Sequence, residues 1–333
     1  MLIKKNHTPM KNTKNEKHLF SFLNRIPVPK RFSTLRFKLI LSFLIPIAFI
    51  ILLGVASYQM SATGLANKYR DTATQVINKT AEYIDFGLET VENTSLEYLN
   101  DKNIISYITY SYKDNAADMI QVKKTIQNDF VVKSMVDKFI GDIYIIPDNG
   151  VTISSISTLK QDGVYKEIIE NDFGKQLTKT NFIWSGVKPF MDEILGTDNS
   201  DYALRLSRKF PSHPAILVID VNADTIKQTI EDTNLDETGI LAFVTHDGKE
   251  ISKNNIDEIS FSNYEFYKNA VEKEDPQGSE YVNINGKSYL FMYSKIGESG
   301  AMICAMIPEA TITSQADNIK QITIFIVIIA CII

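Results

Sequence analysis

The stretch LAFVTHDGKEISK at Leu241–Lys253 repeats the pattern of IYIIPDNGVTISS at Ile143–Ser155. Aligned without gaps at an offset of 98 residues, both contain strand-forming residues, an acidic turn, a glycine and an Ile-Ser pair. An Asn-Gly or Asp-Gly pair between two such runs is the strongest short signal for a β-hairpin, and its glycine supplies a positive φ. Two copies predict two similar modules in tandem, although two unrelated hairpins could also resemble each other by chance.

The segments around the two hairpins complete two similar sets of elements. The first hairpin is followed by a helical or loop segment and then by strand patterns at Asn181–Ser185, Tyr202–Phe210 and Ala215–Val221. The second is followed by a predicted helix, Asn263–Lys273, and by strands at Ser279–Ile284, Lys287–Ser294 and Ala301–Ile307. A helix at Ala223–Thr233 begins the second set. This order predicts an α+β fold of two PAS-like modules, each an antiparallel sheet with helices on its faces.

A long helix is predicted before the first hairpin. No proline occurs between Pro46 and Pro147, and apolar residues recur at helical spacing, so we expect the helix to continue to about Asn100. Its apolar stripe consists of Ile77, Ile84, Leu88, Val91 and Tyr98. The stripe is typical either of a dimer seam or of a helix that covers a sheet. A second helical pattern contains Met119, Val122, Ile126 and Phe130.

Two uncharged apolar runs flank these modules. Leu39–Tyr58 has 20 residues, enough to cross the hydrocarbon core as a helix. A buried core helix and a signal peptide are the alternatives; no A-x-A cleavage site follows the run. Gln321–Ile333 has 13 residues, too few to span alone. We therefore interpret the chain as a fragment that ends inside a second transmembrane helix.

Charge predicts the orientation of the chain in the membrane. Residues 1–38 carry ten Lys or Arg and one acid, Glu16, whereas residues 59–319 hold 24 basic and 39 acidic residues. A basic flank stays in the cytoplasm, so the acidic middle is expected outside a multi-pass protein of the cell membrane. The basic arm could also bind nucleic acid, but the acidic bulk would repel phosphate. Cys304 and Cys331 lie in different regions, so we expect no disulfide within the exported part.

These patterns divide the chain into four parts: a cytoplasmic basic arm at 1–36, a transmembrane helix at 37–58, an exported region at 59–319 and the start of a second transmembrane helix at 320–333. Within the exported region we expect the long helix at 59–100, a first module at about 101–221, distal to the membrane, and a second module at about 222–310, proximal to it.

Two further stretches resemble a known family. TGILAFVTHDGKEIS, Thr238–Ser252, is similar to the Thr-Gly, strand, Asp-Gly and strand pattern of double Cache sensor domains, and ILVIDVNADTI, Ile216–Ile226, resembles their strand that ends in Asp. With the spans and the two modules, the resemblance covers residues 60–310. The run Phe37–Tyr58 looks most like clostridial methyl-accepting chemotaxis proteins. Sensor histidine kinases and diguanylate cyclases use the same domain.

The resemblance implies a ligand site in the distal module. Amino-acid-binding members carry a Tyr, then Arg-x-Trp-Tyr, then an Asp at the end of the last strand. Asp220 matches the last position, but Gly163–Thr180 contains Tyr165 and neither Arg nor Trp, a departure from amino-acid recognition. Arg205, Arg208 or Lys188 could instead pair with an anionic ligand, and Trp184 could stack on it. The alternatives are a core aromatic for Trp184 and a residue of a helix cap for Asp220.

The sequence carries no motif for catalysis, a metal or a cofactor. The resemblance implies a transmembrane chemoreceptor that binds a small solute, anionic or amino-acid-like, and signals as a homodimer through cytoplasmic partners, without nucleic acid. The output could also be a histidine kinase or a diguanylate cyclase. The alternative of another class is a membrane-anchored exported hydrolase or adhesion module.

Overall fold

The computed structural model describes residues 35–109, 115–156, 163–235, 238–254, 259–314 and 317–332. Nearly all of the predicted basic arm lies outside these residues. Contacts divide the chain into two compact units. One is Ala62–Ala316; the other combines Met1–Ser61 with Asp317–Ile333. Each unit is described by itself below.

The terminal unit contains the apolar part of helix α2 (Leu35–Leu99) and helix α11 (Asp317–Ile332). Among the described residues, α2 is the helix long and apolar enough to cross a membrane, and no residue of its most apolar window is buried, as expected for a surface that faces lipid. The apolar part of α11, Lys320–Ile329, is shorter. The helix α2 ends at Leu99, which confirms the predicted end near Asn100.

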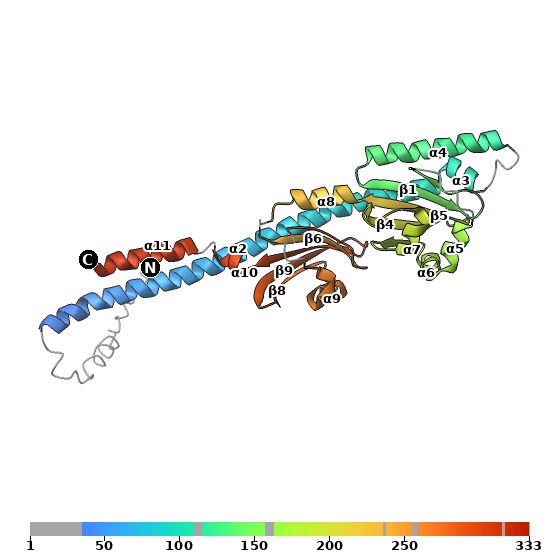
Figure 1. The fold of residues 1–333 in the computed structure, drawn as a ribbon. Coiled ribbons are helices and arrows are strands. Elements are labelled where there is room, and N and C mark those ends of the chain that lie inside the picture. Colours follow the sequence, from blue (N-terminus) through green and yellow to red (C-terminus); the bar gives the residue numbers. More distant parts are fainter. Residues whose placement is uncertain are drawn as a thin grey trace, which may run out of the picture. The chain divides into compact units, whose positions relative to one another are not determined.

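The larger unit contains two five-stranded antiparallel sheets with the same topology (Figure 1). The first module has the order β2-β1-β5-β4-β3 and the second the order β7-β6-β10-β9-β8. The strands of the first are β1 (Ile140–Pro147), β2 (Ile153–Ser154), β3 (Phe182–Ser185), β4 (Tyr202–Lys209) and β5 (Ala215–Asn222). Those of the second are β6 (Ile240–Thr245), β7 (Glu250–Lys253), β8 (Gln277–Ile284), β9 (Lys287–Ile296) and β10 (Ala301–Pro308). The two predicted modules, and every predicted strand, are thus confirmed.

The repeated stretches form equivalent hairpins. In the first, Ile145 pairs with Ile153, and in the second, Phe243 pairs with Ile251, so the register is the same at the offset of 98 residues. Gly150 and Gly248 have φ values of 119° and 93°, which L-residues with a side chain rarely adopt. The similarity of the two stretches therefore reflects equivalent structure.

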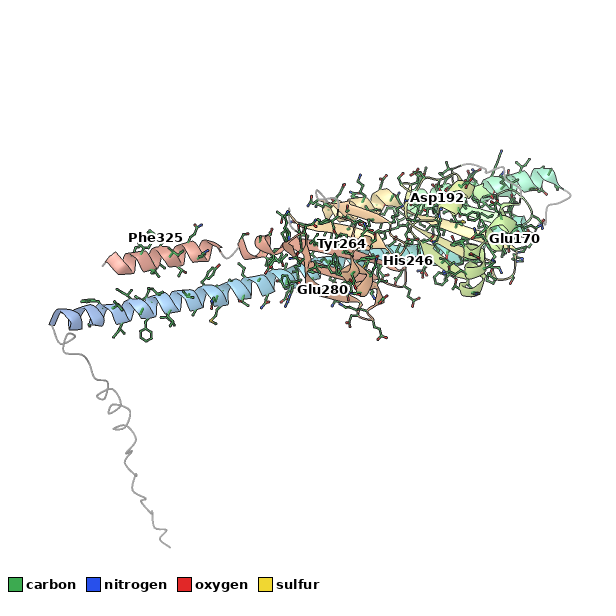
Figure 2. All side chains as sticks on the ribbon, turned by 60° about the horizontal axis from the view of Figure 1, so that its bottom comes forward. Glu170, Asp192, His246, Tyr264, Glu280 and Phe325 are labelled. Atoms are coloured by element: carbon green, nitrogen blue, oxygen red, sulfur yellow. The ribbon has the colours of Figure 1, made fainter. Side chains whose placement is uncertain are left out.

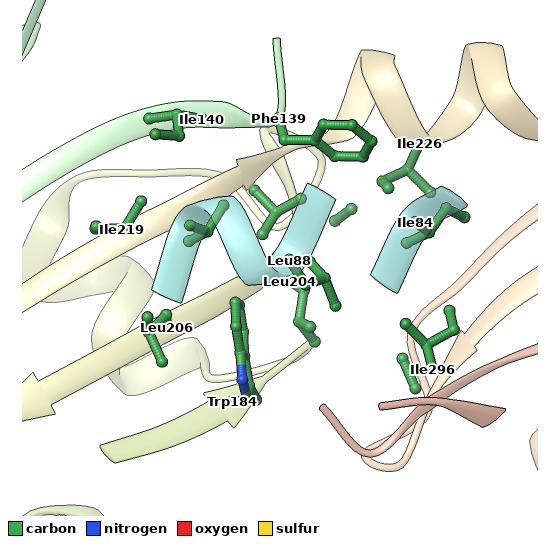
Figure 3. Packing of buried hydrophobic residues seen from close by; sticks show 14 of the residues in the cluster. Ile84, Leu88, Phe139, Ile140, Trp184, Leu204, Leu206, Ile219, Ile226 and Ile296 are labelled. Atoms are coloured by element: carbon green, nitrogen blue, oxygen red, sulfur yellow. The ribbon is translucent and has the colours of Figure 1, made fainter. Parts of the chain in front are cut away.

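The stripe of α2 covers both sheets. Ile84 and Leu88 are buried in one cluster with Leu204, Leu206 and Ile219 of the first sheet and Ile296 of the second (Figure 3). Ile77, Val91 and Tyr98 belong to the same cluster. Full burial of one such side chain stabilises a fold by roughly 1.5–3 kcal/mol, so this helix holds the two modules together. Of the two interpretations of the stripe, the structure shows a helix that covers a sheet.

The remaining helices lie on the faces of the sheets (Figure 1). They are α3 (Lys102–Ile108), α4 (Ala116–Val136), α5 (Val164–Glu170), α6 (Asp172–Thr180), α7 (Pro189–Leu195), α8 (Ala223–Asp232), α9 (Glu265–Glu272) and α10 (Glu309–Ser314), with a 3-10 turn, η2 (Phe261–Asn263). In the first module, α2 and α4 pack on one face of the sheet, and α5, α6 and α7 pack on the other. The helices α3, α7 and α10 were not predicted.

Candidate functional site

A buried ion pair lies on the face of the first sheet that α5–α7 cover. Arg205 of β4 pairs in register with Asp220 of β5, and its Nε and Nη2 donate to the two carboxylate oxygens of Asp220 at 2.6 and 2.9 Å. The exposed fractions are 0% for Arg205 and 3% for Asp220. Alternation along a strand explains the position, because the neighbours Leu204 and Leu206 point to the α2 face. The strands thus bring together two of the predicted site residues.

Helix α7 supplies a second carboxylate. Nη1 of Arg205 and the hydroxyl of Tyr202 donate to Oδ1 of Asp192 at 2.7 and 2.9 Å. Nη2 of Arg205 also donates to Oγ1 of Thr197 at 3.0 Å, and the guanidinium lies over the Tyr202 ring at 4.0 Å. Pro189 begins α7, and Gly196, in a left-handed conformation with φ of 64°, ends it. These two residues fix the short helix that positions Asp192.

The guanidinium is therefore occupied by protein groups. Within the described residues, four of its hydrogen bonds go to Asp220, Asp192 and Thr197. Burial alone would lower the pKa of Arg205, but Asp220, Tyr202 and Asp192 raise the pKa above its ordinary value. One cation thus faces two carboxylates, and a carboxylate ligand would have to displace one of them.

Three buried hydroxyl groups on the strands of the first sheet lack a hydrogen-bond partner among the described residues: those of Tyr144, Ser185 and Ser207. Ser185 pairs with Arg205, while Tyr144 and Ser207 flank Val218 on the same face. A buried hydroxyl without a partner costs about 1–3 kcal/mol, so a group that fills these valences would stabilise the module.

The second sheet carries apolar or aromatic residues at the equivalent positions. The shared register equates Tyr144, Arg205, Ser207 and Asp220 with Ala242, Phe291, Tyr293 and Met306. All four of these belong to one buried apolar cluster with the side chains of α9 and η2. The polar cluster is therefore a property of the first module, and the same face of the second is filled by its own core.

Two other predicted site residues lie elsewhere. Trp184 packs in the cluster around α2, on the face opposite to Arg205, and its Nε1 donates to Glu92 at 3.0 Å (Figure 3). Trp184 therefore lies in the core, as the alternative of a core aromatic predicts. The guanidinium of Arg208 lies over the ring of Phe182 at 4.6 Å, and burial lowers its pKa. Neither residue is brought to Arg205.

Tyr165 and Lys188 have different surroundings. Tyr165, on α5, is half-buried against the apolar cluster of the α5–α7 face, and burial raises its pKa. Lys188 forms an ion pair with Asp247 of the second module at 3.7 Å. The alternative that Asp220 caps a helix is wrong, because Asn222 caps α8 through the amide of Thr225.

Sequence reasoning missed two of the three residues that accept hydrogen bonds from the Arg205 guanidinium. Asp192 and Thr197 lie in an unpredicted helix and the turn after it, and no motif singles them out. The pairing of Arg205 with Asp220 could have been found, because the predicted strands at Tyr202–Phe210 and Ala215–Val221 place them opposite each other in a hairpin. In the described part of the chain, no group of three His, Cys, Asp or Glu could hold a metal ion.

Comparisons with known proteins identify the fold. Neither a family model nor a curated protein matches the sequence. Among solved structures, the extracellular domain of mmHK1S-Z2, assigned as a histidine kinase, is 12% identical with a TM-score of 0.50, covering 73% of this chain and 98% of its own. That of vpHK1S-Z8, assigned likewise, is 12% identical with a TM-score of 0.50, covering 76% and 96%.

The sensory domain of the Campylobacter jejuni chemoreceptor Tlp3 is also similar, at 12% identity and a TM-score of 0.49, over 77% of this chain and 99% of that one. At such identities the likeness concerns the fold alone. The chain has the fold of extracellular sensory domains built from two Cache-type modules.

Proposed function

We propose that this chain is the sensor region of a transmembrane receptor and that a small solute binds on the α5–α7 face of the first sheet. One observation carries the proposal: three buried hydroxyls that find no partner in the described part of the chain lie on the same face as Arg205, whereas the equivalent face of the second sheet is apolar. Ligand sites combine apolar walls with a few polar groups that fix orientation, and this face has both.

The geometry favours a ligand with hydroxyl, amide or ammonium groups. Arg205 is bound by Asp192 and Asp220, so its charge is already compensated. The hydroxyls of Tyr144, Ser185 and Ser207 can each donate and accept one further hydrogen bond. We propose a neutral polar solute or an amine in place of the anionic ligand that the sequence suggests through Arg205, Arg208 or Lys188.

A thermal-shift screen of the full chain in detergent tests the site. The solutes are amino acids, amines, organic acids, purines and sugars. At a hundred times its Kd a ligand stabilises the folded state by about 2.7 kcal/mol, which raises Tm by several degrees. Ser207→Ala and Tyr144→Phe should reduce this shift. The matched control is Tyr293→Phe, at the position of the second sheet equivalent to Ser207. Equal shifts in all variants would contradict the site.

For the output we propose a chemotaxis receptor, with a multi-pass topology, a cytoplasmic N-terminus and a homodimeric state, as the clostridial resemblance implies. A histidine kinase or diguanylate cyclase output is the second candidate, supported by the two solved structures with a TM-score of 0.50. Deletion of the protein should abolish taxis toward the stabilising solute. Loss of a transcriptional response with taxis intact would favour the second candidate.

A further inference from the structure

The β6–β7 hairpin of the second module contacts the first module at a segment that carries part of the site. This segment, residues 186–202, runs from the end of β3 to the first residue of β4 and contains α7 with Asp192. Figure 2 labels Asp192 in the first module and His246 in the turn of the hairpin. Two residues of the hairpin, Asp247 and Lys249, reach the segment.

Asp247 binds the beginning of the segment. Its carboxylate accepts hydrogen bonds from the amides of Gly186, at 3.0 and 2.9 Å, and of Val187, at 3.0 Å. The Thr245 hydroxyl donates to the same carboxylate at 2.7 Å, and Lys188 adds an ion pair. Backbone amides that converge on one carboxylate form charge-assisted hydrogen bonds, which are roughly twice as strong as neutral ones.

Lys249 binds the end of the segment. Its ammonium donates to the carbonyl oxygens of Asn199 and Tyr202 and to Oδ1 of Asn199 at 3.2 Å, and it lies over the Tyr202 ring at 4.1 Å. The exposed fraction of Lys249 is 8%. Lysine is seldom buried unless its charge is compensated, so these contacts define a specific position for the side chain.

The fit between hairpin and segment is close at Gly186. A Cβ at this position would collide with side-chain atoms of Thr245 and Asp247, so the backbone can approach the hairpin only as glycine. Both ends of the segment are therefore held from the other module, while its middle holds Arg205 through Asp192.

We propose that Asp247 and Lys249 are positioning residues for the site: the β6–β7 hairpin fixes segment 186–202, so that α7 and the second module change conformation together. A solute that moves Asp192 would thereby act on the second module, which follows the first in the chain. Transmission of a solute signal through this contact rests on the proposed function, whereas the coupling between α7 and the β6–β7 hairpin does not.

The coupling can be measured without a ligand, by hydrogen exchange of the full chain in detergent micelles. Asp247→Asn and Gly186→Ala weaken the contact from its two sides. The matched control is Asn149→Ala, an exposed residue at the equivalent position of the first hairpin. We expect about tenfold faster exchange across α7 in both variants, and unchanged α7 exchange in the control. Asp192→Asn should in turn speed exchange in the β6–β7 turn, because coupling is reciprocal.

Faster exchange confined to the amides of Gly186 and Val187, with α7 as in the wild type, would overturn the proposal, since the hairpin would then bind the segment without positioning it. A result in which Asn149→Ala alters α7 as strongly as Asp247→Asn would overturn it too. Because no solute is added, failure here leaves the proposed ligand site standing, and failure of the solute screen leaves the coupling standing.

Discussion

Arg205 and Asp220 face each other across β4 and β5 and form a two-pronged ion pair in the interior of the first module. Such pairs contribute little net stability, but the loss of one partner leaves the other charge buried and uncompensated. The second module has the apolar residues Phe291 and Met306 at the equivalent positions, so the fold itself does not require an ion pair there.

Removal of one partner should therefore be costly, and removal of both much less so. We expect Asp220→Ala to lower the free energy of unfolding by about 3–5 kcal/mol, measured by denaturant titration of the chain in detergent. In an Arg205→Met background the same change should cost clearly less, because no buried cation is then left without Asp220. Additive effects would show that the two side chains do not depend on each other.

The hydroxyl of Tyr144 should destabilise the ligand-free chain. Tyr144→Phe removes a buried group that has no partner among the described residues, and we expect a gain of about 1 kcal/mol. Tyr267 is the matched control, because its hydroxyl donates to the carbonyl of Thr245 at 3.0 Å. Tyr267→Phe should cost a similar amount, so the Tm values of the two variants should move in opposite directions. A loss of stability in both would mean that Tyr144 is satisfied in solution.

Substitutions on the two opposite faces of α2 should differ in their effect on stability. Leu88 is buried under the sheets, whereas Phe86 is 64% exposed. We expect Leu88→Ala to cost about 2–5 kcal/mol of stability and Phe86→Ala to cost almost nothing. If the homodimer forms along the exposed face, Phe86→Ala should instead shift the monomer–dimer balance in analytical ultracentrifugation. A large loss of stability from Phe86→Ala alone would contradict the assignment of faces.

The sequence was informative where a pattern is local. Turn chemistry at Asn149-Gly150 and Asp247-Gly248 predicted both hairpins, and strand-like runs of residues predicted the strands of both sheets. The roles of Asp192 and Lys249 could not be predicted from the sequence, because contacts between distant segments place each of them. Lys249 lies 47 residues from Tyr202, in the other module. The role of Trp184 was ambiguous because an indole suits a core and a ligand site equally. The face of β3 on which the side chain lies decides between the two, and Trp184 lies on the face that packs against α2.

The pKa of Lys249 gives a further prediction. Burial lowers it to about 8, an effect that Arg205 reinforces and that Asp192, Asp220 and Asp247 oppose. In the folded chain this ammonium therefore loses its proton at a lower pH than in the unfolded chain, where lysine titrates near 10.4. Between these values the unfolded state binds more protons, so the contribution of Lys249 to stability rises with pH.

Replacement by methionine keeps the length of the side chain and removes the titration. Between about pH 8 and pH 10 we expect the free energy of unfolding of the wild type to rise relative to that of Lys249→Met, by at most about 1.4 kcal/mol per pH unit. Below pH 7 the free energies of the two proteins should change in parallel. The matched control is Lys253→Met on the same hairpin, whose ammonium donates to the carbonyl oxygens of Glu231 and Thr233 outside the contact with segment 186–202. This variant should follow the wild type. Parallel curves for Lys249→Met over the whole range would mean that this ammonium keeps an ordinary pKa, and hence that it lies outside the interior of the contact.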